Sequence, residues 1–207
     1  MHPIETYKTI EAPSTEIVYK EKNSKFIGYI FPVINENEIK FHLDCLKKNH
    51  PNAVHFCYAY QIGVENIQYR VNDDGEPSNS AGKPIYGQIK SFGLTNVLVV
   101  IVRYFGGIKL GVSGLITAYK TAAAMTINES KIIEKTIKSF FIITFDYKDM
   151  NKIMRIIKEK KLQLISQKMD ELCQIEISSS KKNEEIILAT FNSIPNISIE
   201  KLKMNNF

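Results

Sequence analysis

Hydrophobic and polar positions change with short periods along the first part of the chain, up to about residue 128. Short alternating or continuous apolar segments between turn residues predict strands, whereas apolar positions three and four apart predict helices. Ile39, Leu43 and Leu46 follow the helical spacing, and Asn35 with Glu38 forms a capping-box pattern before them. The strands expected here are Glu16–Lys20, Lys25–Val33, Asn52–Ile62, Ile67–Val71 and Asn96–Tyr104, and two further helices are expected over Pro84–Lys90 and Val112–Glu129.

The segment Val97–Val102 is apolar at every position. Such a continuous run is typical of a strand that is covered on both faces, so we expect this strand to be buried. It is also the longest apolar run in the chain, and it is far shorter than the roughly 20 residues that span a bilayer. We therefore expect no membrane span.

Beyond residue 128 the pattern changes to short segments rich in isoleucine and lysine, with little glycine. The expected elements are a strand over Ile137–Phe145, a helix over Lys148–Lys160, strands over Gln163–Met169 and Leu172–Ser178, a helix over Asn183–Asn192 and a strand over Ile197–Leu202. This order is the ferredoxin-like βαββαβ arrangement. We predict an α+β protein of two domains, residues 1–130 and 131–207.

Charge and cysteine content narrow the class of protein. The 27 Lys and Arg residues exceed the 22 Asp and Glu residues by only +5, which is too little for a dedicated DNA-coating protein but leaves a local phosphate contact open. Cys45, Cys57 and Cys173 are widely spaced and form no CxxC pair, so neither a disulfide scaffold nor a zinc site is expected. Residues 1–5 show no signal-peptide pattern. We expect a cytoplasmic protein without a metal or another cofactor.

A glycine-rich turn lies between the buried strand and the long helix that follows it. A helix start exposes unpaired N–H groups and a positive dipole end, and glycine lets the backbone approach an anion closely. The spacing of Gly106 and Gly111 mimics a P-loop, but Val112 stands where a P-loop needs lysine, so no nucleoside triphosphatase is expected. The same glycines also suit a tight turn with positive φ. The candidate contacts to an anion or RNA are Arg103, Gly106, Gly107, Lys109, Gly111 and Ser113.

A polar loop over residues 72–82 carries three carboxylates within four positions. Carboxylates in such a loop can serve acid–base chemistry or bind a cation, although the same residues suit a surface turn. His55 and Cys57 alternate along a strand and share one face, where an aspartate of the loop can orient His55. The polar candidates are His55, Asp73, Asp74, Glu76, Ser78 and Lys83.

Several motifs follow one another along residues 24–111. They are Ser24-Lys25-Phe26-Ile27, His55-Phe56-Cys57-Tyr58-Ala59-Tyr60, Asp73-Asp74-Gly75-Glu76-Pro77-Ser78, Ala81-Gly82-Lys83-Pro84, and Arg103-Tyr104-Phe105-Gly106-Gly107 followed by Lys109-Leu110-Gly111. With them the chain resembles the YigZ/IMPACT family, in its bacterial two-domain form. The resemblance implies a first domain like domain IV of elongation factor G and its ribosomal-protein relatives, which is an α/β sandwich. It implies a ferredoxin-like second domain similar to domain V of that factor.

The same resemblance implies a role in translation. Eukaryotic members regulate initiation by binding an activator of the amino-acid-starvation kinase, and RNA or ribosome binding has been suggested for bacterial members from their fold. We expect a protein that contacts RNA, the ribosome or a protein of the translation machinery through the glycine-rich turn and the acidic loop. One alternative is a hydrolytic enzyme that uses His55 and the loop carboxylates of residues 73–76. Another is an adaptor whose second domain binds a protein. The sequence favours binding over catalysis and leaves the oligomeric state open.

Overall fold

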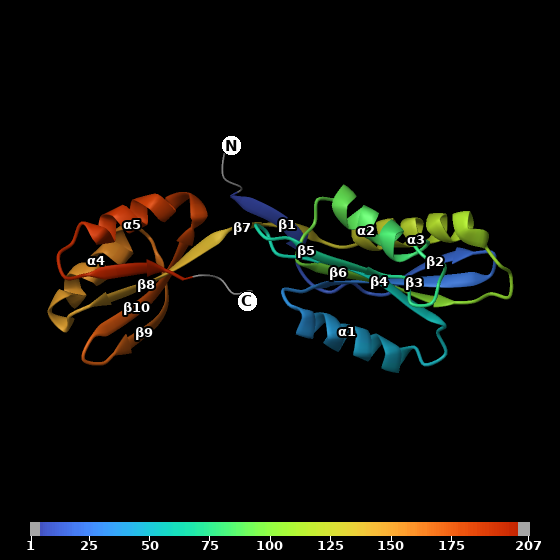
Figure 1. Ribbon diagram of the computed structural model, residues 1–207, viewed down its shortest axis with the longest axis horizontal. Helices are drawn as coiled ribbons and strands as arrows, with labels where there is room; N and C mark the ends of the chain where they lie inside the picture. The colour runs from blue at the N-terminus through green and yellow to red at the C-terminus, as the bar shows by residue number, and fades with distance from the viewer. Residues whose placement is uncertain (1–4, 203–207) are drawn as a thin grey trace. The chain divides into compact units, whose positions relative to one another are not determined.

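The computed structural model describes residues 5–202, which form two compact units. The first unit comprises residues 7–135, and the second comprises residues 136–202 together with residues 5 and 6 (Figure 1). The absence of a signal peptide was inferred largely from residues 1–4, which lie outside the described range.

The first unit is built on a five-stranded sheet in which every pair of neighbouring strands is antiparallel. In sheet order the strands are β2 (Ile17–Glu21), β3 (Ser24–Pro32), β6 (Val97–Tyr104), β4 (His55–Ile62) and β5 (Gln68–Asn72). The central strand β6 is the continuous apolar segment, and its residues 97–103 are all buried. The prediction of a strand covered on both faces is therefore confirmed.

Helices cover both faces of this sheet (Figure 1). They are α1 (Glu36–Asn49) on one face, with α2 (Gly82–Ser91) and α3 (Gly111–Asn128) on the other. The Asn35 side chain accepts the Glu38 N–H at 3.0 Å, which confirms the predicted start of α1. Each face has its own apolar core, and β4 divides its side chains between them. Cys57 faces α2 and α3, whereas Tyr60 faces α1, as the alternation predicts.

Two short strands of the chain were not predicted. β1 (Thr6–Ile10) and β7 (Ile132–Thr136) pair with each other as a separate two-stranded sheet. The boundary expected after residue 130 falls just before β7, whereas the two compact units divide after residue 135. Whether residues 1–130 and 131–207 fold as separate domains stays a prediction.

The second unit has the expected βαββαβ order. Its elements are β8 (Lys138–Phe145), α4 (Met150–Glu159), β9 (Gln163–Met169), β10 (Cys173–Ser180), α5 (Glu184–Asn192) and β11 (Ser198–Lys201). The sheet order β11-β8-β10-β9 is antiparallel throughout, and apolar residues of both helices pack with one face of β8 and β10. The α+β fold, an α/β sandwich followed by a ferredoxin-like unit, is thereby confirmed.

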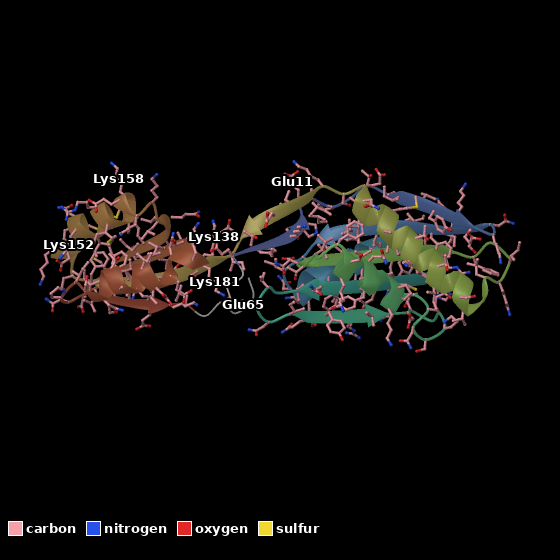
Figure 2. All side chains as sticks on the ribbon, turned by 90° about the horizontal axis from the view of Figure 1, so that it is seen from above. Glu11, Glu65, Lys138, Lys152, Lys158 and Lys181 are labelled. Atoms are coloured by element: carbon pink, nitrogen blue, oxygen red, sulfur yellow. The ribbon has the colours of Figure 1, made fainter. Side chains whose placement is uncertain are left out.

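Cationic side chains occupy the solvent side of α4. Figure 2 shows Lys152 and Lys158 directed outward from this helix, and both are exposed. Within residues 5–202, no helix combines the length and the apolar character needed to cross a membrane.

Candidate functional site

The loop between β5 and α2 is held by the side chain of Asp73. Its carboxylate accepts hydrogen bonds from the backbone N–H groups of Asn79 (2.8 Å), Ala81 (3.0 Å) and Gly82 (2.8 Å). Because α2 begins at Gly82, this carboxylate also compensates the positive end of the helix. Asp73 thus organises its own loop, and its oxygens already have donors.

Asp74 ties the same loop to β4. Its carboxylate accepts the Phe56 N–H at 2.6 Å, and its backbone carbonyl accepts the Nδ1–H of His55 at 2.7 Å. A carbonyl oxygen only accepts, so Nδ1 carries the hydrogen of the ring. The expected contact between His55 and an aspartate is therefore present, but it runs through the backbone of Asp74 and not through a carboxylate.

Glu76 lies at the centre of a buried group of polar side chains at the end of β6. Its Oε1 accepts hydrogen bonds from Arg103 Nη1 at 2.5 Å and from the Tyr119 hydroxyl at 2.8 Å, and His55 Nε2 lies 3.9 Å away. The Glu76 and Arg103 side chains are only 4% and 6% exposed. Buried charges are tolerated when they are paired, so this ion pair lets the loop close over the sheet. We call Glu76, Arg103, Tyr119 and His55 the Glu76 cluster.

Arg103 is also enclosed by aromatic rings. Its guanidinium carbon lies 5.3 Å from the ring centre of Phe26 and 5.7 Å from that of Phe105, within the range of cation–π attraction. Its Nη2 donates to Ser24 Oγ at 3.4 Å, and its buried Nε has no acceptor among the described residues. Arg103 is predicted from the sequence to contact an anion. In the structure its charge is paired with the buried carboxylate of Glu76, and its contact with an anion stays a prediction.

Two groups near Glu76, the Cys57 thiol and the Tyr119 hydroxyl, are kept protonated. Burial raises the pKa of the Cys57 thiol far above its usual range, and burial, reinforced by Cys57 and Glu76, does the same to the pKa of the Tyr119 hydroxyl. The reactive form of cysteine is the thiolate. Neither Cys57 nor Tyr119 is therefore an activated nucleophile, and the hydrolytic alternative, which uses His55 and the carboxylates of residues 73–76, stays a prediction.

Thiol labelling checks this assignment. In the native chain we expect Cys45 to react first with Ellman's reagent at mildly alkaline pH, because it is half-buried while Cys57 and Cys173 are buried. The other two thiols should react only after unfolding. The Cys45→Ser variant should lose the fast phase. A fast phase that persists in this variant and disappears in Cys57→Ser would contradict the protected state of Cys57.

The glycine-rich turn between β6 and α3 packs closely on the turn between β2 and β3. Gly106 donates its N–H to Ser24 Oγ at 3.2 Å, and a side chain at Gly106 would overlap the backbone of Asn23. Gly107 and Gly111 have φ angles of +83° and +72°, which glycine adopts without strain. The tight-turn interpretation of these glycines is therefore supported, and part of the turn already has a hydrogen-bond partner.

The start of α3 is open to solvent. The helix begins at Gly111 without a side-chain cap, and Lys109 and Ser113 are exposed. A cleft of about 260 Å³ opens beside it, between the β2–β3 hairpin and the first turns of α3. The residues that line the cleft are Tyr19, Glu21, Lys22, Leu110, Ser113, Gly114, Thr117 and Ala118.

The wall of this cleft that carries Lys22 was not predicted from the sequence. Pairing of β3 with β6 brings the β2–β3 turn next to the β6–α3 turn, although they lie far apart in the chain. The available signal was the position of Lys22, which comes just before the motif that begins at Ser24.

The structure thus divides the predicted site residues into two groups. His55, Glu76 and Arg103 meet in the Glu76 cluster, and Asp74 is bonded to His55 beside it, whereas Lys109 is exposed on the turn that leads into α3. Ser78 and Lys83 are exposed at the loop and at the first turn of α2.

Comparison with known proteins places both groups within one recognised domain. Residues 22–127 match the Impact N-terminal domain, from the β2–β3 turn to the last turn of α3. The chain is also 36% identical over 162 residues to the IMPACT family member YvyE of Bacillus subtilis, covering 78% of this chain and 74% of that protein. The chain belongs to the IMPACT family.

Other IMPACT family members and solved structures extend the likeness. The Haemophilus influenzae member is 30% identical over 180 residues, covering 84% of this chain and 86% of its own length. A crystal structure described as a hypothetical protein covers 98% of this chain and 100% of its own, with 23% identity and a TM-score of 0.77. That structure therefore shares the fold of both units.

The solved structure of the two-domain translational regulator Yih1 is a weaker match. It covers 57% of this chain and 46% of its own, with 24% identity and a TM-score of 0.37. Both the Glu76 cluster and the open start of α3 belong to the part shared with the Impact N-terminal domain, whereas α4 and the rest of the second unit lie beyond it.

Proposed function

We propose that this chain is a translation-related regulatory protein that acts in the cytoplasm by binding a component of the translation machinery. Membership of the IMPACT family supports the link to translation, since resemblance to that family implies regulation of initiation. RNA, the ribosome and a translation factor are the candidate partners. Binding is favoured over catalysis because the carboxylates of the acidic loop are bonded within the fold.

The observation that carries the proposal is the open start of α3 with two cations beside it. Lys109 precedes the helix, and Lys22 lines the cleft on its other side. Neither lysine has a carboxylate partner among the described residues, and both are exposed. A helix start and nearby lysines attract negative charge together, so an anionic partner fits this position.

Substitution of Lys109 tests the proposal. We expect the labelled, intact chain to bind ribosomes, RNA or a factor of a purified translation system at low salt, and Lys109→Ala to weaken that binding about threefold to tenfold. If the partner is RNA, the slope of log affinity against log salt should fall by about one ion. The measurement is a salt titration followed by fluorescence anisotropy.

Lys152 provides the matched control. It is also exposed but lies on α4 of the second unit, so Lys152→Ala should leave binding unchanged. The proposal fails if the intact chain binds no component of the translation system at low salt.

A further inference from the structure

The turn that leads into α3 exposes apolar side chains. Phe105 and Ile108 are each 49% exposed and Val112 is 54% exposed, whereas Leu110 between them is buried. A single exposed apolar residue is ordinary, but three within the short stretch from Phe105 to Val112, at the start of α3, are the kind of cluster that marks an interaction site. We call Lys22, Phe105, Ile108, Lys109 and Val112 the turn surface.

Lys22 lies beside the turn that carries the exposed apolar residues. Gly106 packs on the backbone of Asn23, and Lys22 lines the same cleft as Leu110 and Ser113. The one carboxylate in the cleft wall, that of Glu21, accepts a hydrogen bond from the Tyr19 hydroxyl at 2.9 Å. This hydrogen bond leaves the Glu21 carboxylate charged, but Lys22 and Lys109 outnumber it, so the net charge that a partner meets here is positive.

The chemistry of the turn surface distinguishes between RNA and protein as partners. Proteins that read single-stranded RNA stack the bases on several aromatic rings and on arginine. Here Phe105 is the one aromatic member of the turn surface, and the Tyr19 ring in the cleft wall is half-buried. The nearby arginine, Arg103, is buried and paired with Glu76. Ile108 and Val112 are aliphatic, and such side chains pack against apolar side chains of a protein.

We propose that the turn surface binds an acidic protein segment that also carries apolar side chains. The proposal rests on the proposed function and specifies its partner. An apolar side chain of the partner enters the cleft against Leu110 and Ala118, while its carboxylates meet Lys22 and Lys109. The lysines steer the encounter, and the apolar contacts hold the complex.

The experiment uses the intact chain and three labelled probes: a peptide of glutamate and leucine, its counterpart with glutamine in place of glutamate, and oligouridylate RNA. Fluorescence anisotropy measures each affinity at low salt. We expect the acidic peptide to bind at least about tenfold more tightly than the other two probes. Phe105→Ser and Ile108→Ser should each weaken it about tenfold, and Lys109→Ala about threefold.

Matched substitutions on other surfaces serve as controls. Phe41 of α1 is 63% exposed, so Phe41→Ser should leave the affinity for the acidic peptide unchanged, as should Lys152→Ala. Thermal unfolding checks that each variant remains folded, which the exposure of these residues favours.

The possible failures have separate meanings. If oligouridylate binds more tightly and only Lys109→Ala weakens it, the partner is RNA, which overturns this inference and leaves the proposed function standing. Equal binding of the two peptides removes the role of charge and overturns the inference. Lack of binding by every probe also overturns it, whereas the proposed function is decided by the separate titration with the translation system.

Discussion

Replacing Arg103 with leucine will destabilise the first unit by about 3–5 kcal/mol. This substitution leaves the Glu76 carboxylate 4% exposed without its cationic partner, and an uncompensated buried charge costs energy on that scale. The Tyr119 hydroxyl still donates to Glu76, but a neutral donor does not neutralise the carboxylate. Urea unfolding followed by circular dichroism measures the change in free energy.

A surface ion pair provides the control for this prediction. Lys131 Nζ lies 2.8 Å from Glu11, but the two side chains are 71% and 51% exposed, so Lys131→Ala should cost at most about 1 kcal/mol. The double variant Arg103→Leu with Glu76→Leu should recover much of the loss, because neither charge then remains buried. An Arg103→Leu variant that costs no more than Lys131→Ala would show that the pair is unimportant for stability.

The pairing of Arg103 with Glu76 shows what could not be predicted about a candidate site residue from the sequence. Arginine at the end of a strand, beside glycines, is a reasonable anion contact when its neighbours are unknown. Its actual partner lies 27 positions earlier in the chain. The fold of the loop places Glu76 there, and that fold depends on hydrogen bonds to Asp73 and Asp74 which no periodic pattern encodes.

The secondary structure was predictable where burial imposed a pattern on the apolar positions. β6 is apolar throughout, β4 alternates between two cores, and α1 carries both a capping pair and an apolar stripe. In contrast, four of the five residues of β7 are exposed, and its partner β1 lies more than 100 residues earlier in the chain. A strand with little buried surface and a distant partner has neither an apolar alternation nor a local turn to reveal it.

The turn surface, too, could be predicted only in part, because one of its sides comes from a distant part of the chain. Its glycines and Lys109 are visible in the sequence as a cluster between a strand and a helix. The contribution of Lys22 depends on the antiparallel register of β3 with β6, in which Lys25 lies opposite Tyr104. This register brings the β2–β3 turn against Gly106 and creates the cleft. One wall of the cleft therefore comes from the β2–β3 hairpin, and the other comes from the start of α3.

That close approach leads to the second large effect, which is expected at Gly106. A Cβ at this position would overlap the carbonyl group of Asn23 and the amide nitrogen of Ser24. These are backbone atoms, which cannot rotate away as a side chain can, so Gly106→Ala must separate the two turns. We expect a loss of about 3 kcal/mol in the free energy of unfolding, at the upper end of the cost of overpacking.

Two other glycines distinguish crowding from backbone strain. Gly107 has open space around a Cβ but a φ of +83°, so Gly107→Ala should cost only about 1–2 kcal/mol from its left-handed backbone. Gly87 lies within α2 and also has open space, so Gly87→Ala should stabilise the chain by up to about 1 kcal/mol. Urea unfolding of the three variants should therefore rank them in the order Gly87, Gly107, Gly106, from gain to greatest loss. Equal losses at Gly106 and Gly107 would mean that the β2–β3 turn can move aside, and the cleft between the turns would then be a pliable feature of the surface.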